Sequence, residues 1–360
     1  MLTVKIVFIA SAASIHSIRW VRYFVEEKHE IILISLAKPN HETKIELNKF
    51  KKQIRIFYFN NLKSIFKTIN FLLCEQYSLV HIHYLGWHSL LSLFISKKAK
   101  LILTPWGSDL LKNKYFFKKI FLNFIFRKAN YLICDSDRLA KESIKMGMKK
   151  ERIQISMFGV DSDIYKKTRT IFNNKIKFFV GSNRKLEKIY DVITFLKTAE
   201  LICQIRKDIF FYVAGSGTLK ETYMKYVKDK KISKNVKFLG LLNRKEMLNF
   251  YNNIDIYVST SLSDGGLAAS IAEAMSFERL IIISDNSDNK LWIKNKINGF
   301  LYKTKDHKAL SKLILNAIEK KENSIQISKK SREIITNKYS YKTEMKNVEN
   351  KYLQILGNSN

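Results

Sequence analysis

Cysteine and proline are scarce in this sequence. Its three cysteines, Cys74, Cys134 and Cys203, are odd in number, lie far apart and sit within apolar runs. They therefore indicate neither a disulfide framework nor a zinc site, and they fit a cytoplasmic protein in a reducing environment. The two prolines accompany abundant lysine, isoleucine, asparagine and phenylalanine, a composition that is also typical of drift in an AT-rich genome.

Acidic residues are half as numerous as basic ones. The 32 Asp and Glu stand against 64 Lys and Arg, which gives a formal net charge of +32. Such a charge attracts nucleic acid, anionic lipid or phosphorylated substrates. Because compositional drift accounts for part of the excess, the charge alone does not choose among these partners.

The apolar run at the N-terminus is too short to cross a membrane. It lies within "MLTVKIVFIASAAS" and continues into a helical pattern instead of a signal-peptide cleavage site, so it predicts the first strand of the fold. The chain has 360 residues, of which 46% are hydrophobic. The length exceeds the usual size of a chain with one hydrophobic core, and it predicts two globular domains.

Short β-branched runs alternate with segments of helical period along the chain. The predicted strands are residues 3–10, 30–36, 54–59, 79–84, 100–104, 130–135, 152–156, 176–181, 208–215, 235–240, 255–260 and 279–284. Nearly continuous apolar strands between helices are typical of parallel sheets covered on both faces. We predict an α/β fold of two doubly wound, Rossmann-like domains, with a break near residues 158–175 and only helices after about residue 306.

The stretch "SLSDGGLAASIAEAM", residues 261–275, joins a strand to a helix and carries two adjacent glycines. Gly265 and Gly266 let the backbone turn sharply and expose N–H groups that, with the helix dipole, form a seat for phosphate. Ser270 adds a hydroxyl donor, and Glu273 can accept hydrogen bonds from paired sugar hydroxyls such as those of a ribose. The alternative is a plain loop with a solvated glutamate.

Two further strand-to-helix junctions carry candidate nucleotide contacts. "VAGSGTLKE" places Gly215 and Gly217 in a G-x-G, but Lys220 stands where a dinucleotide fingerprint has its third glycine. "GSNRKLEKIYD", at residues 181–191, carries the cations Arg184, Lys185 and Lys188. Cations in such a loop can neutralise a diphosphate leaving group without a metal ion, whereas solvated lysines are the simpler interpretation.

Histidines and an aspartate follow the strands of the first half. His81 and His83 lie on one side of a strand end; they could ligate zinc, but no third ligand is near, so we expect a core role for His81 and a contact with a substrate hydroxyl for His83. Asp109 follows the next strand, within "LTPWGSDLL". Ser14 and His16 follow the first strand, in a loop of small residues that lets a ligand approach.

These motifs, taken in order, resemble glycosyltransferase family 4, which has the GT-B fold. The resemblance rests on "SAASIHSIRWVRYF", "HIHYLGWHSLL", "TPWGSDLL", "FGVD", "NVKFLG", "SLSDGG…EAM", "NGFLY" and the closing "YSY" segment, and it spans essentially the whole chain. It implies retaining transfer of a sugar from a nucleotide-sugar, without a metal or other cofactor. It also implies an acceptor-side domain at residues 1–165, a donor domain at 166–335 and a C-terminal helix, 336–360, that packs back on the first domain.

The resemblance assigns roles to individual residues. Glu273 matches the second acid of the family's paired-acid motif, which grips the ribose, and His83 matches the histidine on the donor sugar. Arg184 and Lys188 lie closest to the basic pair on the diphosphate. The other residues implied to line the donor site are Ser14, His16, Asp109, Lys185, Gly215, Gly217, Leu241, Asp264, Gly265, Gly266, Leu267, Ala268 and Ser270.

Two departures bear on these roles. Eight residues lie between Asp264 and Glu273 where the family has seven between its acids, so the backbone from Gly265 to Ala268 can replace the contacts of the first acid. The glycine that usually follows the basic lysine is Ile189 here. The sequence therefore leaves open whether Asp264 replaces the first acid of the family motif.

The acceptor side has one distinctive stretch, residues 110–131. It mixes Lys112, Lys114, Lys118, Lys119, Arg127 and Lys128 with Phe, Ile and Leu at helical spacing. This pattern suits contact with an anionic membrane surface and a lipid-linked or other glycan acceptor of cell-surface polysaccharide or lipopolysaccharide assembly, although an ordinary helix with a core face has the same pattern.

Three competing functions are weaker. A nucleic-acid-binding protein would need a stacking sheet or recognition helix, and neither is visible, so we expect no nucleic-acid partner. A nucleotide-sugar epimerase on the same scaffold lacks part of its acidic and histidine set, and a phosphorylase lacks a pyridoxal phosphate lysine motif.

Overall fold

The computed structural model describes residues 3–111, 116–156, 159–160, 169–173, 176–264, 268–286 and 289–357. The chain divides into two compact units, each built on a parallel sheet. Unit 1 comprises Met1–Phe158 with Glu344–Asn360, and unit 2 comprises Gly159–Thr343. No helix within the described ranges is both long and apolar enough to cross a membrane.

Unit 1 is a seven-stranded sheet with the order β3-β2-β1-β4-β5-β6-β7. Its strands are β1 Lys5–Ile9, β2 Glu30–Ser35, β3 Ile54–Tyr58, β4 Leu79–His83, β5 Lys100–Thr104, β6 Tyr131–Cys134 and β7 Ile153–Ile155. The connecting α-helices are α1 Ile15–Glu26, α2 His41–Asn48, α3 Leu62–Cys74, α4 Ser108–Leu111, α5 Phe116–Lys128 and α6 Asp137–Lys145. Three 3₁₀ helices complete it: η1 Lys51–Gln53, η2 Trp87–Phe94 and η3 Lys150–Arg152.

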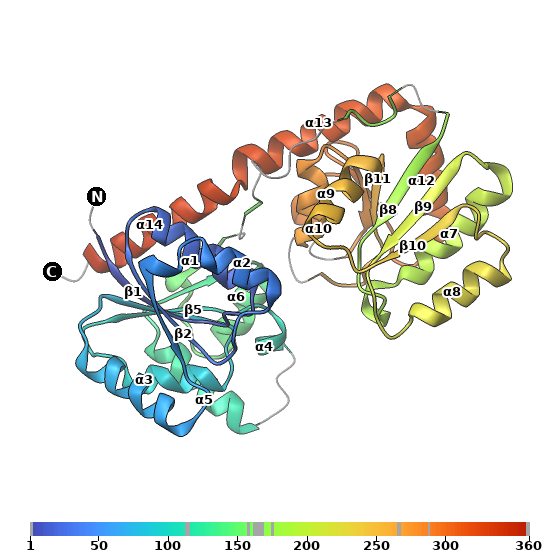
Figure 1. Ribbon diagram of the computed structural model, residues 1–360. Helices are drawn as coiled ribbons and strands as arrows, with labels where there is room; N and C mark the ends of the chain where they lie inside the picture. The colour runs from blue at the N-terminus through green and yellow to red at the C-terminus, as the bar shows by residue number, and fades with distance from the viewer. Residues whose placement is uncertain are drawn as a thin grey trace. The chain divides into compact units, whose positions relative to one another are not determined.

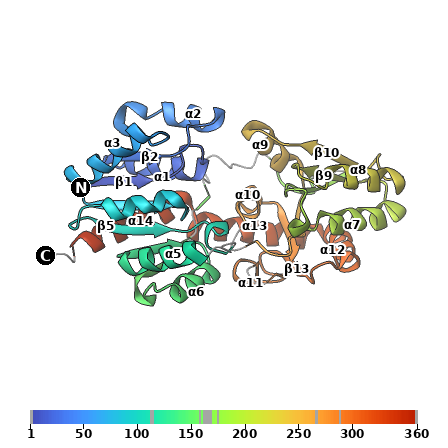
Figure 2. The same cartoon turned by 90° about the horizontal axis from the view of Figure 1, so that it is seen from below.

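The two faces of this sheet are covered by different helices. α3, η2 and α5 pack their apolar side chains on one face, in a core that includes Phe71, Leu91 and Ile125. The last helix, α14 Tyr341–Gly357, lies beside α1, as both views show (Figures 1 and 2). Tyr352 of α14 stacks on Phe24 of α1, with ring centroids 5.0 Å apart. From Glu344 onward α14 belongs to unit 1, so the chain returns to the unit in which it began.

Unit 2 is a six-stranded sheet with the order β10-β9-β8-β11-β12-β13. Its strands are β8 Phe178–Ser182, β9 Ile209–Ala214, β10 Val236–Gly240, β11 Ile256–Ser259, β12 Leu280–Ser284 and β13 Phe300–Tyr302. Its helices are η4 Lys188–Tyr190, α7 Val192–Ile205, α8 Lys220–Asp229, α9 Arg244–Asn253, α10 Ala269–Ser276, α11 Asn289–Trp292, α12 His307–Glu319 and α13 Lys321–Lys338. Each of the twelve predicted strands is found, and every strand pair is parallel. β13 was not predicted, because three residues are too few to show a period.

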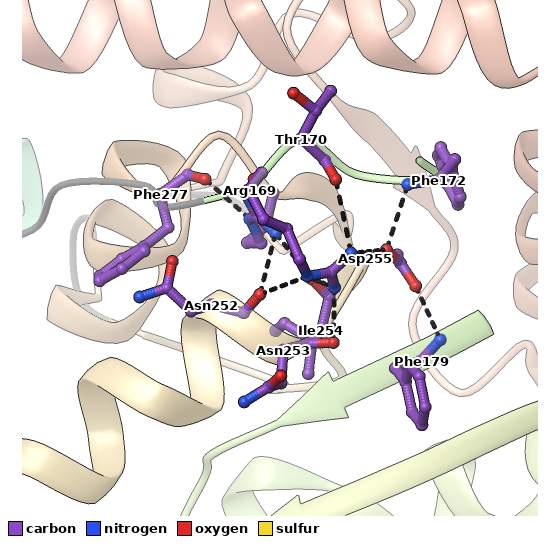
Figure 3. A network of polar contacts seen from close by, with 10 residues as sticks. Arg169, Thr170, Phe172, Phe179, Asn252, Asn253, Ile254, Asp255 and Phe277 are labelled. Carbon is purple, nitrogen blue, oxygen red and sulfur yellow. Dashed lines mark hydrogen bonds and ion pairs between the residues drawn. The ribbon is translucent and has the colours of Figure 1, made fainter. Parts of the chain in front are cut away.

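A buried polar network fastens the start of unit 2 to its sheet (Figure 3). The fully buried carboxylate of Asp255 accepts hydrogen bonds from the amides of Phe172 and Phe179 at 3.2 and 2.9 Å, and it pairs with Arg169 at 3.1 Å. Arg279, also fully buried, donates to the carbonyl oxygens of Arg169 and Ile254, and burial lowers its pKa to about 10. The segment that enters unit 2 is thereby fixed to the sheet that carries the site described next.

Candidate functional site

The strand order of unit 2 reverses between β8 and β11, so the loops that leave these two paired strands lie side by side. In doubly wound sheets, ligands bind at the carboxyl ends of the strands at such a switch point. The amide of Leu262 donates to the carbonyl oxygen of Ile189 at 2.9 Å, and Thr260 Oγ1 donates to that of Tyr190 at 2.8 Å. The basic loop and the loop before α10 therefore form one continuous surface.

Arg184 cross-links these two loops through its guanidinium group. Its Nε donates to Ser261 Oγ at 3.1 Å, its Nη1 donates to Ser270 Oγ at 2.9 Å, and its Nη2 pairs with the buried carboxylate of Asp264. The guanidinium carbon also lies 4.6 Å from the centre of the Tyr190 ring, a cation–π contact. The structure thus brings together three of the predicted site residues: Arg184, Asp264 and Ser270.

Glu273 lies one turn beyond Ser270 on α10 and is oriented by a buried tyrosine. Tyr251, on α9, donates its hydroxyl hydrogen to Glu273 Oε2 at 2.7 Å and accepts from Asn183 Nδ2 at 2.7 Å. Burial, and then the charge of Glu273, raise the pKa of Tyr251 well above its usual value, so the hydroxyl stays protonated and able to donate. Sequence reasoning missed Tyr251 and Asn183, because Tyr251 occupies an ordinary core position of an amphipathic helix.

The N-terminus of α10 points to this same loop. Ala268 occupies the N-cap and has no side-chain acceptor for the first amides of the helix, which is the condition under which a helix start can receive an anion. Lys185 and Lys188 are exposed on the neighbouring basic loop. Gly265, Gly266 and Leu267 lie outside the described residues.

The two glycines of the G-x-G serve the packing of one loop on another. A Cβ on Gly215 would lie 2.6 Å from the carbonyl oxygen of Arg184, and one on Gly217 would lie 2.4 Å from that of Leu186. Gly215 also has a φ of +124°, which disfavours any other residue. The backbone of Leu186 both donates to Ser216 and accepts from Leu219, at 3.1 and 3.0 Å. The G-x-G therefore holds the Arg184 loop in place, whatever contact it makes with a ligand.

Leu241 follows β10 at the same edge of the sheet. Its side chain is exposed, and the preceding Gly240 has a φ of +71°, in the left-handed region that suits glycine. A Cβ on Gly240 would meet nothing within 4 Å among the described residues. The backbone here is open, as a contact with a nucleotide base requires.

In unit 1 the strand order reverses between β1 and β4, and β4 ends in His83. The His83 ring is buried, with its centroid 4.9 Å from Trp20, 5.6 Å from Phe8 and 5.8 Å from Trp106. Neither ring nitrogen has a hydrogen-bond partner among the described residues. Burial lowers the pKa of His83 to about 3, so the imidazole is neutral at physiological pH.

His81 differs from His83 in having partners for both ring nitrogens. Its Nε2 lies 2.7 Å from Thr104 Oγ1, and its Nδ1 contacts the hydroxyl of Tyr352 on α14. This histidine joins the last helix to the centre of the sheet. His81 and His83 therefore differ in role, because only His83 carries polar atoms that the described protein leaves unused.

Trp106 is the common neighbour of the predicted unit 1 residues, and sequence reasoning did not single it out. Its ring centroid lies 5.2 Å from that of His16, and its amide donates to Asp109 Oδ1 at 3.0 Å. Asp109 Oδ2 accepts from the amide of Leu85 at 2.7 Å, so this carboxylate ties the loop after β4 to the loop after β5. Ser14 caps α1, accepting from the amide of Ser17 at 3.3 Å.

No group of three or more His, Cys, Asp or Glu side chains that could hold a metal ion occurs in the part of the chain that the structure describes.

The two sites differ in chemistry. Unit 2 presents an arginine, a helix start and a carboxylate, which suit a diphosphate and a sugar diol. Unit 1 presents a neutral imidazole among aromatic rings.

Two parallel-sheet units, each with polar residues at its switch point, define the GT-B class of fold. Solved structures agree with this assignment. A glycosyltransferase from Rickettsia africae ESF-5 matches with a TM-score of 0.82 at 17% identity and covers 100% of both chains. HepE from Anabaena, solved in complex with UDP and glucose, matches with a TM-score of 0.79 at 15% identity and covers 98% of this chain and 100% of its own.

Comparisons with protein families identify the class of enzyme. A model described as glycosyl transferases group 1 matches residues 163–334, and one described as glycosyl transferase 4-like matches residues 5–136. An uncharacterised glycosyltransferase of Methanocaldococcus jannaschii is 26% identical over 238 residues, which span 62% of this chain and 60% of that relative. The chain belongs to the GT-B glycosyltransferases of the family 4 type.

Proposed function

We propose that this chain transfers a sugar from a nucleotide-sugar to a glycan or lipid-linked acceptor, with retention and without a metal ion. The observation that carries the proposal is the geometry around α10, where Arg184 contacts Ser270 and Glu273 follows one turn later. An arginine and a helix start suit the diphosphate, and Glu273 suits the ribose hydroxyls. The complex of HepE with UDP and glucose supports a donor of this class.

The reaction then follows from the charges. The bond from the anomeric carbon to the diphosphate oxygen breaks with oxocarbenium character, and the electron pair leaves with the phosphate. Arg184 is already paired with Asp264, so exposed Lys185 and Lys188 and the helix start supply further positive potential for the leaving group. The acceptor hydroxyl attacks the same face of the sugar and gives its proton to the leaving phosphate oxygen, which preserves the anomeric configuration.

In this proposal, unit 1 contacts the donor sugar and binds the acceptor. The neutral ring of His83 can donate to, or accept from, a sugar hydroxyl without bringing charge near the oxocarbenium ion. We place the reaction in the cytoplasm, at the inner face of the membrane, in the assembly of a cell-surface polysaccharide or lipopolysaccharide. The basic stretch at residues 110–131 supports an acceptor presented at an anionic surface.

A thermal-shift screen against UDP, GDP, ADP, CMP and their sugar conjugates tests the donor site. The matching nucleotide raises the melting temperature of the wild type, by binding the native state only, and this rise is lost in Glu273→Ala and Arg184→Ala. Arg206→Ala is the matched control, because Arg206 also pairs with an aspartate, Asp208 at 2.6 Å, but precedes β9 at the opposite edge of the sheet. A screen in which oligonucleotides stabilise the protein and no nucleotide does would overturn the proposal.

Two measurements test the proposed retention of configuration and the proposed independence of metal ions. The anomeric configuration of the product, read by NMR, must equal that of the donor. Transfer must also persist when EDTA is present at saturating donor concentration. An inverted product or a complete loss of activity in EDTA contradicts the corresponding part of the proposal.

A further inference from the structure

The 3₁₀ helix η2 packs Leu91 in the core, but it also exposes three large apolar side chains and buries two hydroxyls. Its three-residue repeat places Trp87, Leu90 and Leu93 on one exposed face, and the Trp87 side chain is 66% exposed. The opposite face buries Ser89 and Ser92, whose hydroxyl oxygens have no hydrogen-bond partner among the described residues. These two hydroxyls point inward and these three large apolar side chains point outward, the reverse of what water favours.

The helices next to η2 also expose large apolar side chains. Lys128 of α5 donates to the carbonyl oxygen of Ser92 at 2.6 Å, which joins α5 to η2. One and two turns before Lys128, α5 exposes Phe124 and Ile120. α3 packs against η2 on its other side and exposes Phe66. We call the surface defined by Phe66, Trp87, Leu90, Leu93, Ile120 and Phe124 the apolar face.

The chain around the apolar face is almost purely basic. Residues 47–134 contain fifteen Lys and Arg but only two acidic residues, Glu75 and Asp109. Asp109 is buried and bonded to backbone amides, and Glu75 pairs with Lys5 and Arg55 at 3.4 and 3.5 Å. No acidic residue of this segment is therefore available to repel an anionic partner.

We propose that the apolar face docks on the surface of an anionic lipid bilayer. Its aromatic and aliphatic side chains enter the interfacial region while the surrounding lysines and arginines stay with the lipid phosphates. A second copy of this chain would place basic residues against basic residues. A nucleic acid would match the charge but would leave Leu90, Leu93 and Ile120 without an apolar partner.

This inference deepens the proposed function but can be tested without it, because vesicle binding needs neither donor nor acceptor. Trp87 of the apolar face lies four residues after His83, the last residue of β4. A bilayer at this face would bring the headgroup region, where a lipid-linked acceptor presents its glycan, to the carboxyl ends of the unit 1 strands.

Co-sedimentation of the full chain with vesicles measures the docking. We expect binding to phosphatidylcholine vesicles that contain phosphatidylglycerol, weakening as salt rises, and little binding to phosphatidylcholine alone. The double variant Trp87→Ser/Leu93→Ser should bind roughly tenfold or more weakly, because two apolar side chains no longer leave water. Trp87 fluorescence should shift to the blue on binding.

Matched variants separate docking from general damage. Ile205→Ser removes an equally exposed apolar side chain, 67% exposed, from unit 2 and should leave vesicle binding unchanged. Lys63→Ala/Lys67→Ala, on α3, should weaken binding about tenfold, whereas Lys234→Ala/Lys237→Ala in unit 2 should not. Melting temperatures of all variants, with and without nucleotide, report folding and the donor site on the same samples.

Four results would overturn the inference: no binding of the wild type to anionic vesicles, equal losses in the face and control variants, a wild-type dimer that Trp87→Ser/Leu93→Ser dissolves, or displacement of the vesicles by oligonucleotide. The dimer would assign the face to a second copy, and the displacement would assign it to nucleic acid. If a nucleotide stabilises the protein but vesicles are not bound, the docking surface fails while the donor site stands. If vesicles are bound and no nucleotide stabilises the protein, the proposed function fails and the docking surface stands.

Discussion

Two buried side chains, Tyr251 of unit 2 and His83 of unit 1, differ in whether the described residues supply hydrogen-bond partners for their polar atoms. In unit 2, Tyr251 is fully buried and its hydroxyl contacts Glu273 and Asn183, and Arg184 has three side-chain oxygen partners. In unit 1, His83 is equally buried, but neither ring nitrogen has a hydrogen-bond partner within the described ranges. A buried polar group without a partner costs about 1–3 kcal/mol of stability, so it persists where something other than stability maintains it.

Under the proposed function, this difference corresponds to two tasks. A site that must stabilise charge on a leaving diphosphate benefits from cations and oriented carboxylates that are already fixed. A site beside a developing oxocarbenium ion benefits from a group that forms hydrogen bonds and carries no charge. The pKa of about 3 keeps His83 in that neutral state across the physiological range.

The largest effect is expected at Arg184. Replacing it with alanine removes the guanidinium that joins Ser261, Asp264 and Ser270, so both the leaving group and the loop lose support. We expect kcat/KM for sugar transfer to fall by roughly 10²–10³. Arg184→Lys keeps the charge but not the fork of donors, and it should restore activity only in part. Full activity in Arg184→Ala would remove the contrast between the units.

The second largest effect is expected at His83, where a substitution should lower activity without lowering stability. His83→Phe keeps the ring among Trp20 and Trp106 but removes both nitrogens, so transfer should fall by roughly tenfold to a hundredfold. The melting temperature should hold or rise, because an unpartnered polar group is removed. Steady-state kinetics and calorimetry on one preparation measure both. A lower melting temperature with unchanged kinetics would make His83 a structural residue.

The same substitution should change how stability depends on pH. In the unfolded chain the imidazole binds a proton below its usual pKa of 6.5, whereas in the folded protein it does so only near 3. Proton binding by the unfolded chain therefore destabilises the fold by about 1.4 kcal/mol per pH unit as pH falls from 6.5 toward 3, and this penalty is absent above pH 6.5. Urea unfolding between pH 7 and 4.5 should show a shallower decline for His83→Phe than for the wild type. Parallel declines would refute the buried, neutral state.

Sequence pattern predicted the strands well, because a strand covered on both faces must be apolar along its length. β13 escaped, since Phe300–Tyr302 is too short for a period to show. Arg184 and Glu273 were predicted as site residues from their places in strand-to-helix junctions; the structure places Arg184 against Ser270 of α10, and Glu273 lies on the same helix.

The remaining site residues depend on contacts that no local pattern encodes. Nothing in the sequence of α9 distinguishes a tyrosine that reaches Glu273 from one that only fills the core. Trp106 gains its place from His16 and Asp109, which precede and follow it on the chain. The G-x-G of Gly215 and Gly217 resembles a nucleotide-binding motif. The close backbone of Arg184 and Leu186 already requires glycine at both positions, because a side chain there would clash with it.

The smallest effect is expected at Tyr251, which tests the hydrogen bonds of unit 2. Tyr251→Phe removes the hydroxyl that orients Glu273, so the nucleotide should bind roughly threefold to tenfold more weakly, and the melting temperature should fall because Asn183 and Glu273 each lose a buried partner. Tyr302→Phe is the matched control, since its buried hydroxyl has no partner among the described residues. Titration calorimetry with the stabilising nucleotide measures the two variants side by side. If both bind like the wild type, Glu273 does not depend on Tyr251 for its orientation, and the hydrogen bonds of Tyr251 serve stability alone.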